Sequence, residues 1–478
     1  MSRLNQLTIT GAQEGLKKKE FSSREMVKDC LRRIEEIDKK IKAFITVCDE
    51  NATKEAEKKD GRIRVERDLK ILFRKYPLFG IPVVVKDNFC TAEIKTTAAS
   101  RVLENYIPTY DATVVKKLKE AGAIILGKTN LDAWAHGSST ETSDFFTTRN
   151  PWNLSRLPGG SSGGSAAAVV ADMTIAAVGS ETGGSIRQPS AWCGTVGLKP
   201  TYGRVSRFGL IAMASSLDSP GPMTKIVEDS AVMLQVLAGK DDLDSTSLPN
   251  PIPDYSANFN KGVSGIKIGV PKEYFFSEVQ EDVIKRVSEA VRIFEKMGVE
   301  IKEVSLFDPK YAIAVYTILQ RAEVSANLAR YDGIRYGNDR TFLGKEAKKR
   351  IMLGTFVLSA GYYEAYYQRA QKVRTLICQD FDEVFKGVDL ILGPTSPSVA
   401  MPFGASKESP MFGEIQDALV EPSTIAGLPG INICCGFSSD NLPVGLQIIG
   451  PQLGEELLFR TALAYQNETQ WHLKKPKI

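Results

Sequence analysis

The stretch Gly159-Gly-Ser-Ser-Gly-Gly-Ser-Ala-Ala-Ala-Val-Val-Ala-Asp-Met-Thr-Ile-Ala-Ala-Val-Gly-Ser-Glu-Thr-Gly-Gly-Ser185 consists mainly of small residues. Seven glycines, five serines and six alanines stand among its 27 residues. Apolar runs at 166–171 and 174–178 predict a helix and a strand between the glycine turns. The stretch therefore predicts two tight Gly-Ser turns that are joined by packed, regular structure.

The sequence before this stretch alternates between strand and helix patterns. Residues 81–86 form a short β-branched run that predicts a buried strand, 114–121 predict a helix and 123–126 the next strand. This strand–helix–strand order favours parallel pairing with helices on the faces of the sheet. We therefore predict an α/β fold with a central mixed, mostly parallel sheet between layers of helices.

The rest of the chain extends this fold in both directions. Further predicted elements are a helix at 222–240 and strands at 267–270, 389–393 and 445–449. With 478 residues but no internal repeat and no Pro/Ser linker, we expect one large domain over 1–478 rather than about three ordinary ones. Its parts are a charged helical segment with a capping box at Ser22 and Glu25 (1–75), a core (80–240), a helical region (310–385) and a return to the sheet (386–478).

The composition is that of a globular protein and argues against polyanion-binding and membrane proteins. Hydrophobic residues make up 43% and charged residues 25%, as in ordinary globular proteins. A net charge of +4 is too small for a dominant polyanion-binding surface. We expect no membrane association, because the chain has no signal-like N-terminus and no run of about 18 uncharged apolar residues. The seven cysteines, an odd number without a CxxC pair, favour a reducing cytoplasm.

Only two histidines, His136 and His472, are present. Ser-His-Asp catalysis needs a histidine in the right place, and two histidines cannot form a three-histidine metal site. Residues 159–163 match the G-x-S-x-G nucleophile elbow, but 156–158 form a poor strand and His472 is nearly C-terminal. We therefore expect both histidines to be structural and any catalytic base to be of another type.

Residues 122–129 match the phosphate-binding pattern G-x-x-x-x-G-K-T. A real phosphate-binding loop has its strand before the first glycine and a loop between the glycines. Here the four intervening residues are themselves the predicted strand, so we do not expect a nucleotide site.

Lys86 stands at the end of the apolar run 81–86. Burial lowers the pKa of a lysine, and the neutral amine is a competent base. The alternative is a lysine that emerges from the strand end and pairs with Asp87.

A second Gly-Ser turn contains Gly183, Gly184 and Ser185. Consecutive glycines let backbone N–H groups converge as an oxyanion hole needs, although Gly-Gly-Ser is also a common structural turn. A lysine base with two serines in glycine turns could perform acyl transfer, with Ser162 and Ser165 as competing serines.

Taken together, Lys86, the 159–165 turn and 183–189 resemble the amidase signature family, including a spacing of 24 between Ser161 and Ser185. Glu181, Ser190 and Trp192 depart from the family pattern, which has Asp, Ala and Phe there. The resemblance covers essentially the whole chain. Further stretches resemble one branch, the glutaminase subunits of tRNA-dependent amidotransferases, at 198–206, 331–337, 350–355, 371–376, 393–397 and 426–431.

The resemblance implies a role for each member of the catalytic set. Ser185 would be the nucleophile that attacks the side-chain amide of glutamine. Lys86 would be the base, acting through Ser161, which would follow a cis peptide bond. The implied oxyanion hole consists of the backbone N–H groups of Thr182, Gly183, Gly184 and Ser185.

The resemblance also implies a glutamine pocket in the helical region 310–385 and beyond it. Arg350 would bind the α-carboxylate, Asp417 the α-amino group, and Tyr316 would make a further contact. Arg374 competes for the role of Arg350. Asp380 and Asp382 compete for that of Asp417.

Finally, the resemblance implies a heterotrimer with B and C subunits. This chain would bind glutamine and no cofactor or metal, while ATP and Mg²⁺ would be bound by a partner. Mischarged Glu-tRNA(Gln) or Asp-tRNA(Asn) would be processed by the complex. Two alternatives are a stand-alone hydrolase of small amides and a non-enzymatic subunit, which would need 122–129 to bind ATP.

Overall fold

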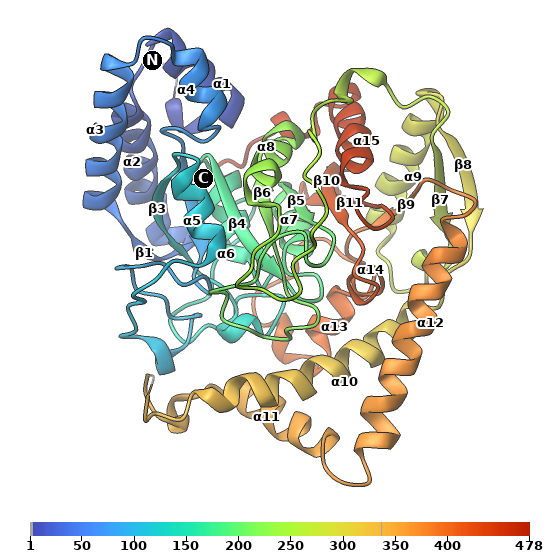
Figure 1. The fold of residues 1–478 in the computed structure, drawn as a ribbon. Helices are drawn as coiled ribbons and strands as arrows, with labels where there is room; N and C mark the ends of the chain where they lie inside the picture. The colour runs from blue at the N-terminus through green and yellow to red at the C-terminus, as the bar shows by residue number, and fades with distance from the viewer. Residues whose placement is uncertain (1–2, 336) are drawn as a thin grey trace.

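The computed structural model describes residues 3–335 and 337–478. The first two residues of the N-terminus and Tyr336, within the 331–337 stretch, lie outside the described residues. In the described part of the chain, eleven strands form one sheet in the order β1-β3-β2-β4-β6-β5-β10-β11-β9-β7-β8 (Figure 1). The strands are β1 (Phe44–Val47), β2 (Pro82–Lys86), β3 (Ile124–Thr129), β4 (Ala176–Glu181), β5 (Val196–Lys199), β6 (Ser219–Thr224), β7 (Lys267–Pro271), β8 (Glu300–Val304), β9 (Leu390–Pro394), β10 (Gly430–Phe437) and β11 (Pro443–Ile449).

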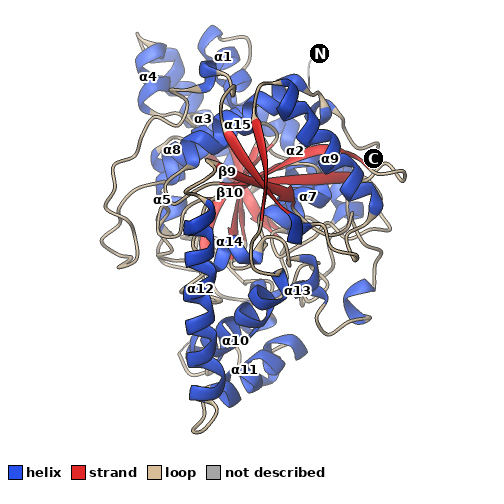
Figure 2. Ribbon diagram, turned by 90° about the vertical axis from the view of Figure 1, so that its right-hand side faces the viewer, coloured by secondary structure: helices blue, strands red, loops and turns tan. Residues whose placement is uncertain are grey.

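Helices enclose the sheet, and α10, α11 and α12 extend away from it as an arm (Figure 2). Within the described residues, no helix combines the length and the apolar character that crossing a bilayer requires. The α-helices are α1 (Ile9–Lys18), α2 (Ser23–Ile41), α3 (Asp49–Val65), α4 (Leu69–Lys75), α5 (Thr113–Glu120), α6 (Gly163–Val170), α7 (Arg187–Cys193), α8 (Val227–Leu237), α9 (Glu281–Lys296), α10 (Pro309–Asn327), α11 (Lys345–Val357), α12 (Arg369–Val384), α13 (Phe412–Gln416), α14 (Glu421–Ile425) and α15 (Glu455–Glu468).

The strand pairing confirms the predicted α/β class with a mixed sheet. β2 pairs in parallel with β3 and β4, and β7 pairs in parallel with β8 and β9. The other described pairs are antiparallel, including all those in the middle of the sheet. Parallel pairs therefore do not predominate as expected. The short connection between β10 and β11 explains part of this, because a tight turn can join only antiparallel strands.

Two local predictions need correction. The helix expected at 222–240 begins only at Val227, because 219–224 are strand β6, which pairs with β4 and β5. The segment 1–75 is helical, with the predicted capping box at Ser22 and Glu25, but it also contains β1. This four-residue strand pairs with β3 at the edge of the sheet.

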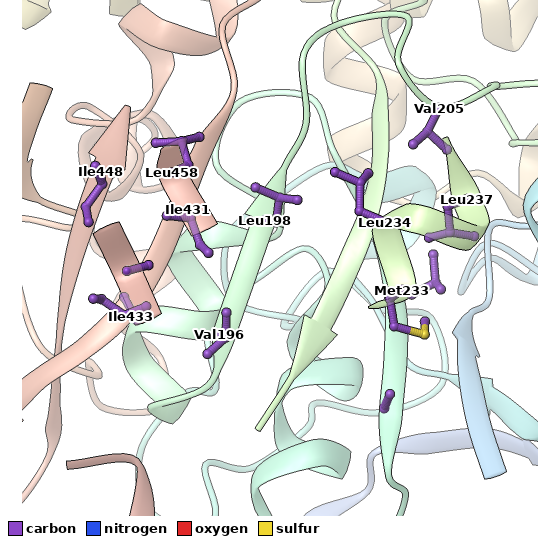
Figure 3. Close-up of a cluster of buried hydrophobic side chains, with 14 of the residues drawn as sticks. Val196, Leu198, Val205, Met233, Leu234, Leu237, Ile431, Ile433, Ile448 and Leu458 are labelled. Atoms are coloured by element: carbon purple, nitrogen blue, oxygen red, sulfur yellow. The ribbon is translucent and has the colours of Figure 1, made fainter. Parts of the chain in front are cut away.

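A hydrophobic cluster holds the middle of the sheet against α8 and α15 (Figure 3). Burial of each large aliphatic side chain contributes about 1.5–3 kcal/mol, before the entropy of ordering is deducted. The cluster fixes β5 and β10, between which no other strand intervenes. Its side chains include Val196, Leu198, Leu234, Leu237, Ile431, Ile433, Ile448 and Leu458.

The parallel neighbours β2 and β4 bring the two predicted chemical segments together. Val85 of β2 is in register with Val178 of β4. The carboxyl ends of both strands therefore lie at the same edge of the sheet, where ligand sites of α/β folds usually form. Lys86 ends one strand, and the turn that carries Ser185 follows the other.

Lys128, the lysine of the 122–129 pattern, lies inside strand β3, which extends beyond the predicted 123–126 to Thr129. Its Nζ is 3.1 Å from Asp87 Oδ1 and donates to Thr96 Oγ1 at 2.8 Å, and the lysine and the aspartate are both fully buried. This lysine therefore serves a buried ion pair instead of a phosphate. Asp87 is paired with Lys128, not with Lys86, so the alternative reading of Lys86 does not hold.

We predict that Lys128→Met lowers the free energy of unfolding by about 3–5 kcal/mol, because it leaves a buried carboxylate without its partner. Lys116→Met is the control, since Lys116 is exposed and lies 4.0 Å from Glu120; its effect should stay within about 1 kcal/mol. Urea denaturation measures both. Equal effects of the two substitutions would contradict the assignment.

Candidate active site

Lys86 is completely buried at the end of β2. Its Nζ lies 2.7 Å from Ser161 Oγ and 3.0 Å from both the carbonyl and the hydroxyl oxygen of Ser180. Burial lowers the pKa of this lysine to about 7, although the charges of nearby acids oppose the shift. Near neutral pH a substantial fraction of the amine is therefore uncharged, as a general base must be.

Ser161 lies in the turn before α6, and the Gly160–Ser161 peptide bond is cis, as the resemblance implies. The N–H of Gly160 donates to Gln188 Oε1 at 2.9 Å. A Cβ on Gly160 would overlap Asp132 Oδ2 and come within 2.5 Å of the Ser139 nitrogen. Only glycine therefore allows this close approach, which fixes the position of Ser161 beside Lys86.

The turn between β4 and α7 carries Ser185, which is almost fully buried. Glu181 accepts the N–H groups of Ile186 and Arg187, both at 3.1 Å, and its carboxylate lies 2.6 Å from the guanidinium of Arg187. The carboxylate thus caps the start of α7, and its hydrogen bonds hold the turn in place. The N–H of Ser162 donates to the Ser185 carbonyl at 3.1 Å, so the two serine-bearing turns are in direct contact.

The backbone of this second turn is held from the side opposite its N–H groups. Thr424 Oγ1 donates to the Gly183 carbonyl at 2.7 Å, and the N–H of Gln188 donates to the Gly184 carbonyl at 2.8 Å. In a trans peptide the carbonyl and the following N–H point in opposite directions. The N–H groups of Gly184 and Ser185 therefore point away from Thr424 and Gln188. The remaining predicted member, Thr182, donates its hydroxyl to Asp218 Oδ1 at 2.6 Å.

Two of the predicted pocket residues pack directly against this turn. A Cβ on Gly183 would lie 2.9 Å from Tyr316 Cζ on α10, and one on Gly184 would overlap Asp417 Oδ1. Ser138 donates to Asp417 Oδ2 at 2.7 Å, whereas Oδ1 has no hydrogen-bond partner among the described residues. Burial raises the pKa of the Asp417 carboxyl well above its ordinary range. Asp417 therefore offers a free buried acceptor beside the turn.

Arg350 lies almost fully buried on α11 and is already fixed in place. Its Nε donates to Glu346 Oε1 at 2.7 Å and its Nη1 to Gln320 Oε1 at 2.9 Å. Burial raises the pKa of the Tyr316 phenol well above its ordinary range, and the charge of Arg350 opposes this shift. Arg350 is thus electrostatically coupled to a residue that touches the turn.

The competing candidates lie on α12 and have other contacts. Arg374 donates to the Ile425 carbonyl at 3.0 Å and to Ser216. Asp380 accepts the N–H of Phe307 at 2.7 Å, and Asp382 lies one turn of helix away from Cys378. Of the competing serines, Ser165 shares a 2.7 Å hydrogen bond with Thr129, and Ser162 donates to the Ser180 carbonyl at 3.1 Å.

Four polar residues at the site were not predicted from the sequence: Asn88, Ser138, Ser180 and Asp218. The rule that singled out Lys86 also applies to Ser180, a polar residue at the end of a buried strand, and to Asn88, two residues after Lys86. Ser138 and Asp218 carry no such local signal. Their contacts with Asp417 and Thr182 become visible only in the fold.

His136 is buried, and its two ring nitrogens have no hydrogen-bond partner among the described residues. Burial lowers its pKa well below the ordinary value, and the charges of Arg350 and Arg321 act in the same direction. Over residues 3–335 and 337–478, no three His, Cys, Asp or Glu side chains are grouped so that they could hold a metal ion.

Comparison with known proteins places this site in a family. The amidase family model matches residues 25–459. A relative from Geobacillus sp. (strain WCH70) is 50% identical over 97% of each chain, and one from Roseiflexus sp. (strain RS-1) is 48% identical over 100% of this chain and 99% of its own. The crystal structure of a protein from Thermotoga maritima has a TM-score of 0.84 and 42% identity, covering 100% of this chain and 99% of its own.

The chain therefore belongs to the amidase signature family, and it is part of an enzyme. All three proteins compared above carry the name of the A subunit of glutamyl-tRNA(Gln) amidotransferase. Within the family, this chain belongs with these amidotransferase A subunits, which are parts of a multi-subunit enzyme.

We predict that Gly184→Ala reduces amide hydrolysis about a hundredfold, because the added methyl group displaces Asp417 or the turn itself. Gly61→Ala in α3 is the control, since nothing lies within 4 Å of a Cβ there. It should leave activity unchanged and raise the free energy of unfolding by up to about 1 kcal/mol. Initial rates and thermal melts test both. Normal activity of Gly184→Ala would refute the close packing.

Proposed function

We propose that the chain hydrolyses glutamine at Ser185 and supplies the ammonia to a partner subunit, which amidates mischarged Glu-tRNA(Gln) or Asp-tRNA(Asn). The observation that carries this proposal is the buried Lys86 amine, 2.7 Å from Ser161 and at the same sheet edge as the Ser185 turn. The names of the relatives and the match to the family support it.

Ser185 attacks the side-chain amide carbon of glutamine and forms the acyl-enzyme. Its hydroxyl proton passes to Ser161 while the proton of Ser161 passes to Lys86, so that no charge accumulates on the bridging serine. Lys86 returns the proton through the same path to the leaving nitrogen, which departs as ammonia. Water then hydrolyses the ester bond to Ser185 in the reverse sense and releases glutamate.

The oxyanion of each tetrahedral intermediate forms at the carbonyl oxygen of the substrate. The N–H groups of Thr182, Gly183, Gly184 and Ser185 supply its hydrogen bonds, and removal of one such donor typically costs about 3 kcal/mol. Asp417 Oδ1 accepts from the α-ammonium group of glutamine, Arg350 binds the α-carboxylate and Tyr316 lines the pocket. The ammonium group stabilises the ionised form of Asp417, which offsets the burial of that carboxylate.

We also propose that the chain acts in the cytoplasm as one domain, in a heterotrimer with B and C subunits. One sheet takes strands from three of the four parts of the chain, from β1 near the N-terminus to β11 near the C-terminus, which supports a single domain. ATP and Mg²⁺ are bound by the partner that activates the tRNA-linked carboxylate, and this chain itself needs neither.

Ser185→Ala should lower glutamine-dependent amidation of the mischarged tRNA by at least about 10⁴-fold, since the nucleophile is lost. Free ammonia should still support amidation, because the partner does not need Ser185. Ser165→Ala is the matched control and should retain glutamine-dependent transfer, as its hydroxyl bonds to Thr129. Loss of both the glutamine-dependent and the ammonia-dependent reaction in a correctly assembled complex would contradict this division of labour.

The pH dependence of glutamine hydrolysis should follow the ionisation of Lys86. Protonated lysine cannot accept a proton, so kcat/KM should rise with pH, with a midpoint near the Lys86 pKa of about 7. Initial rates between about pH 5.5 and 8.5 test this. A kcat/KM that falls as the pH rises through this range would rule out Lys86 as the base.

A further inference from the structure

Besides Ser161, Ser180 contacts the Lys86 amine, and Asn88 in turn contacts Ser180. Ser180 is buried in β4, and both its carbonyl and its hydroxyl oxygen lie 3.0 Å from Lys86 Nζ. Asn88 Nδ2 donates to the same hydroxyl at 2.8 Å. We propose that Ser180, held by Asn88, is a positioning residue that turns the lone pair of Lys86 toward Ser161. This inference rests on the proposed function.

The argument begins with the protons of the amine. Neutral Lys86 has two N–H groups and one lone pair, and three oxygen atoms surround its nitrogen. The Ser180 carbonyl can only accept, so it takes one N–H. If the Ser180 hydroxyl accepts the second N–H, the lone pair is left for the O–H of Ser161. If that hydroxyl donated to the lone pair instead, Lys86 could not take the proton of Ser161.

Asn88 contributes to the first of these arrangements by holding the Ser180 oxygen in place. A hydroxyl oxygen has two lone pairs, and the amide N–H of Asn88 already occupies one of them. When the other accepts from Lys86, the O–H of Ser180 must take the remaining tetrahedral direction, away from Nζ. The amide therefore anchors the Ser180 oxygen and leaves one of its lone pairs for Lys86, which supports the arrangement in which Lys86 accepts from Ser161.

The sheet leaves the Ser180 carbonyl available for this role. The residue in register with Ser180 on β6 is Pro220, which has no N–H to donate. Ser162 Oγ donates to the same carbonyl at 3.1 Å, so Lys86 and Ser162 can use its two lone pairs. Because Pro220 cannot complete a hydrogen-bonded pair of the antiparallel ladder, the Ser180 carbonyl points away from β6 and is free for Lys86.

The same three oxygen atoms also suit the protonated amine. After proton transfer Lys86 carries three N–H groups, and Ser161 Oγ and the two oxygens of Ser180 can each accept one. No side chain has to move between the two states, which is the condition for low-cost proton transfer. The acids whose charges reach Lys86, namely Asp132, Asp218 and Glu181, have other donors: Asp132 accepts from Thr140, Asp218 from Thr182 and Glu181 from Arg187.

The test is the pH profile of kcat/KM for glutamine in the assembled enzyme with Ser180→Ala. This variant leaves one N–H of the protonated amine without an acceptor, which penalises the charged form more than the neutral one. We expect kcat/KM to fall about tenfold to a hundredfold and its acidic limb to move to lower pH by about one unit. A purely structural role would lower the rate without moving the limb, and an unmoved limb or one at higher pH overturns the proposal.

Three further variants complete the test. Ser162→Ala removes a neighbouring hydroxyl that bonds to the Ser180 carbonyl but not to Lys86, and should leave the acidic limb in place. Ser180→Thr keeps the hydroxyl, so the acidic limb should return to its wild-type pH. Asn88→Ala removes the hydrogen bond that holds Ser180. It should move the acidic limb to lower pH, by less than Ser180→Ala does. If Ser180→Ala fails to assemble, Asn88→Ala decides by the same criterion.

Lys86→Ala separates this inference from the proposed function. If Lys86→Ala keeps the wild-type rate, the proposed mechanism fails as a whole. If Lys86→Ala is inactive and Ser180→Ala behaves like the wild type, only the positioning role fails.

Discussion

The burial of a lysine amine at the end of a parallel strand is the constraint on which the centre of this molecule depends. An amine in an apolar interior is tolerated only when its hydrogen-bonding groups are satisfied. Ser161, in the turn before α6, and Ser180, in β4, satisfy Lys86. The β2–β4 pairing, the close approach at Gly160 and the contact between the two serine turns all serve to bring these groups around one nitrogen.

A second buried charge, that of Arg187, links the turn that carries Ser185 to the segment that contains α14. The guanidinium of Arg187 bonds to Glu181 and also to the Val420 carbonyl, just before α14, and to Thr424 within α14. Breaking such a fully buried pair would leave an uncompensated charge, which is usually costly. The departure from the family pattern at Glu181 keeps the carboxylate, so the same pairing forms. The turn that carries Ser185 and the segment beside Asp417 are therefore held as one unit.

The local patterns predicted what depends on neighbours in the sequence. The strand at 82–86, the helix at 113–120 and the cap at Ser22 follow from short periodic runs and a capping signature. β1 was not predicted because four residues within a charged helical segment carry too little signal. Parallel pairing was overestimated because a pattern that identifies a strand says little about the direction of its neighbour.

The residues of the site likewise fall into those that a local sequence pattern predicts and those that only tertiary contacts reveal. The two glycine turns and Lys86 are recognisable because each lies in a motif of its own. The contacts of Asp417 with Gly184 and Ser138, and of Asp218 with Thr182, join residues far apart in the chain or without a local signature. Tertiary packing alone creates these contacts. For Arg350, Asp417 and Tyr316, only the family resemblance gave a reason to choose them over Arg374, Asp380 and Asp382.

The arm formed by α10–α12 projects from the sheet (Figure 2). It supplies Tyr316 and Arg350, whereas Lys86 ends strand β2 and Ser185 lies in the turn after β4. In the proposed mechanism, the residues that break the bond and two of those that bind the substrate thus lie on different parts of the chain. Apart from Tyr316, which packs against Gly183, side chains on the arm can be exchanged without replacing a residue that the glycine turns pack against. One scaffold can in this way be adapted to amides of different shape and charge, while the arrangement around the lysine stays the same.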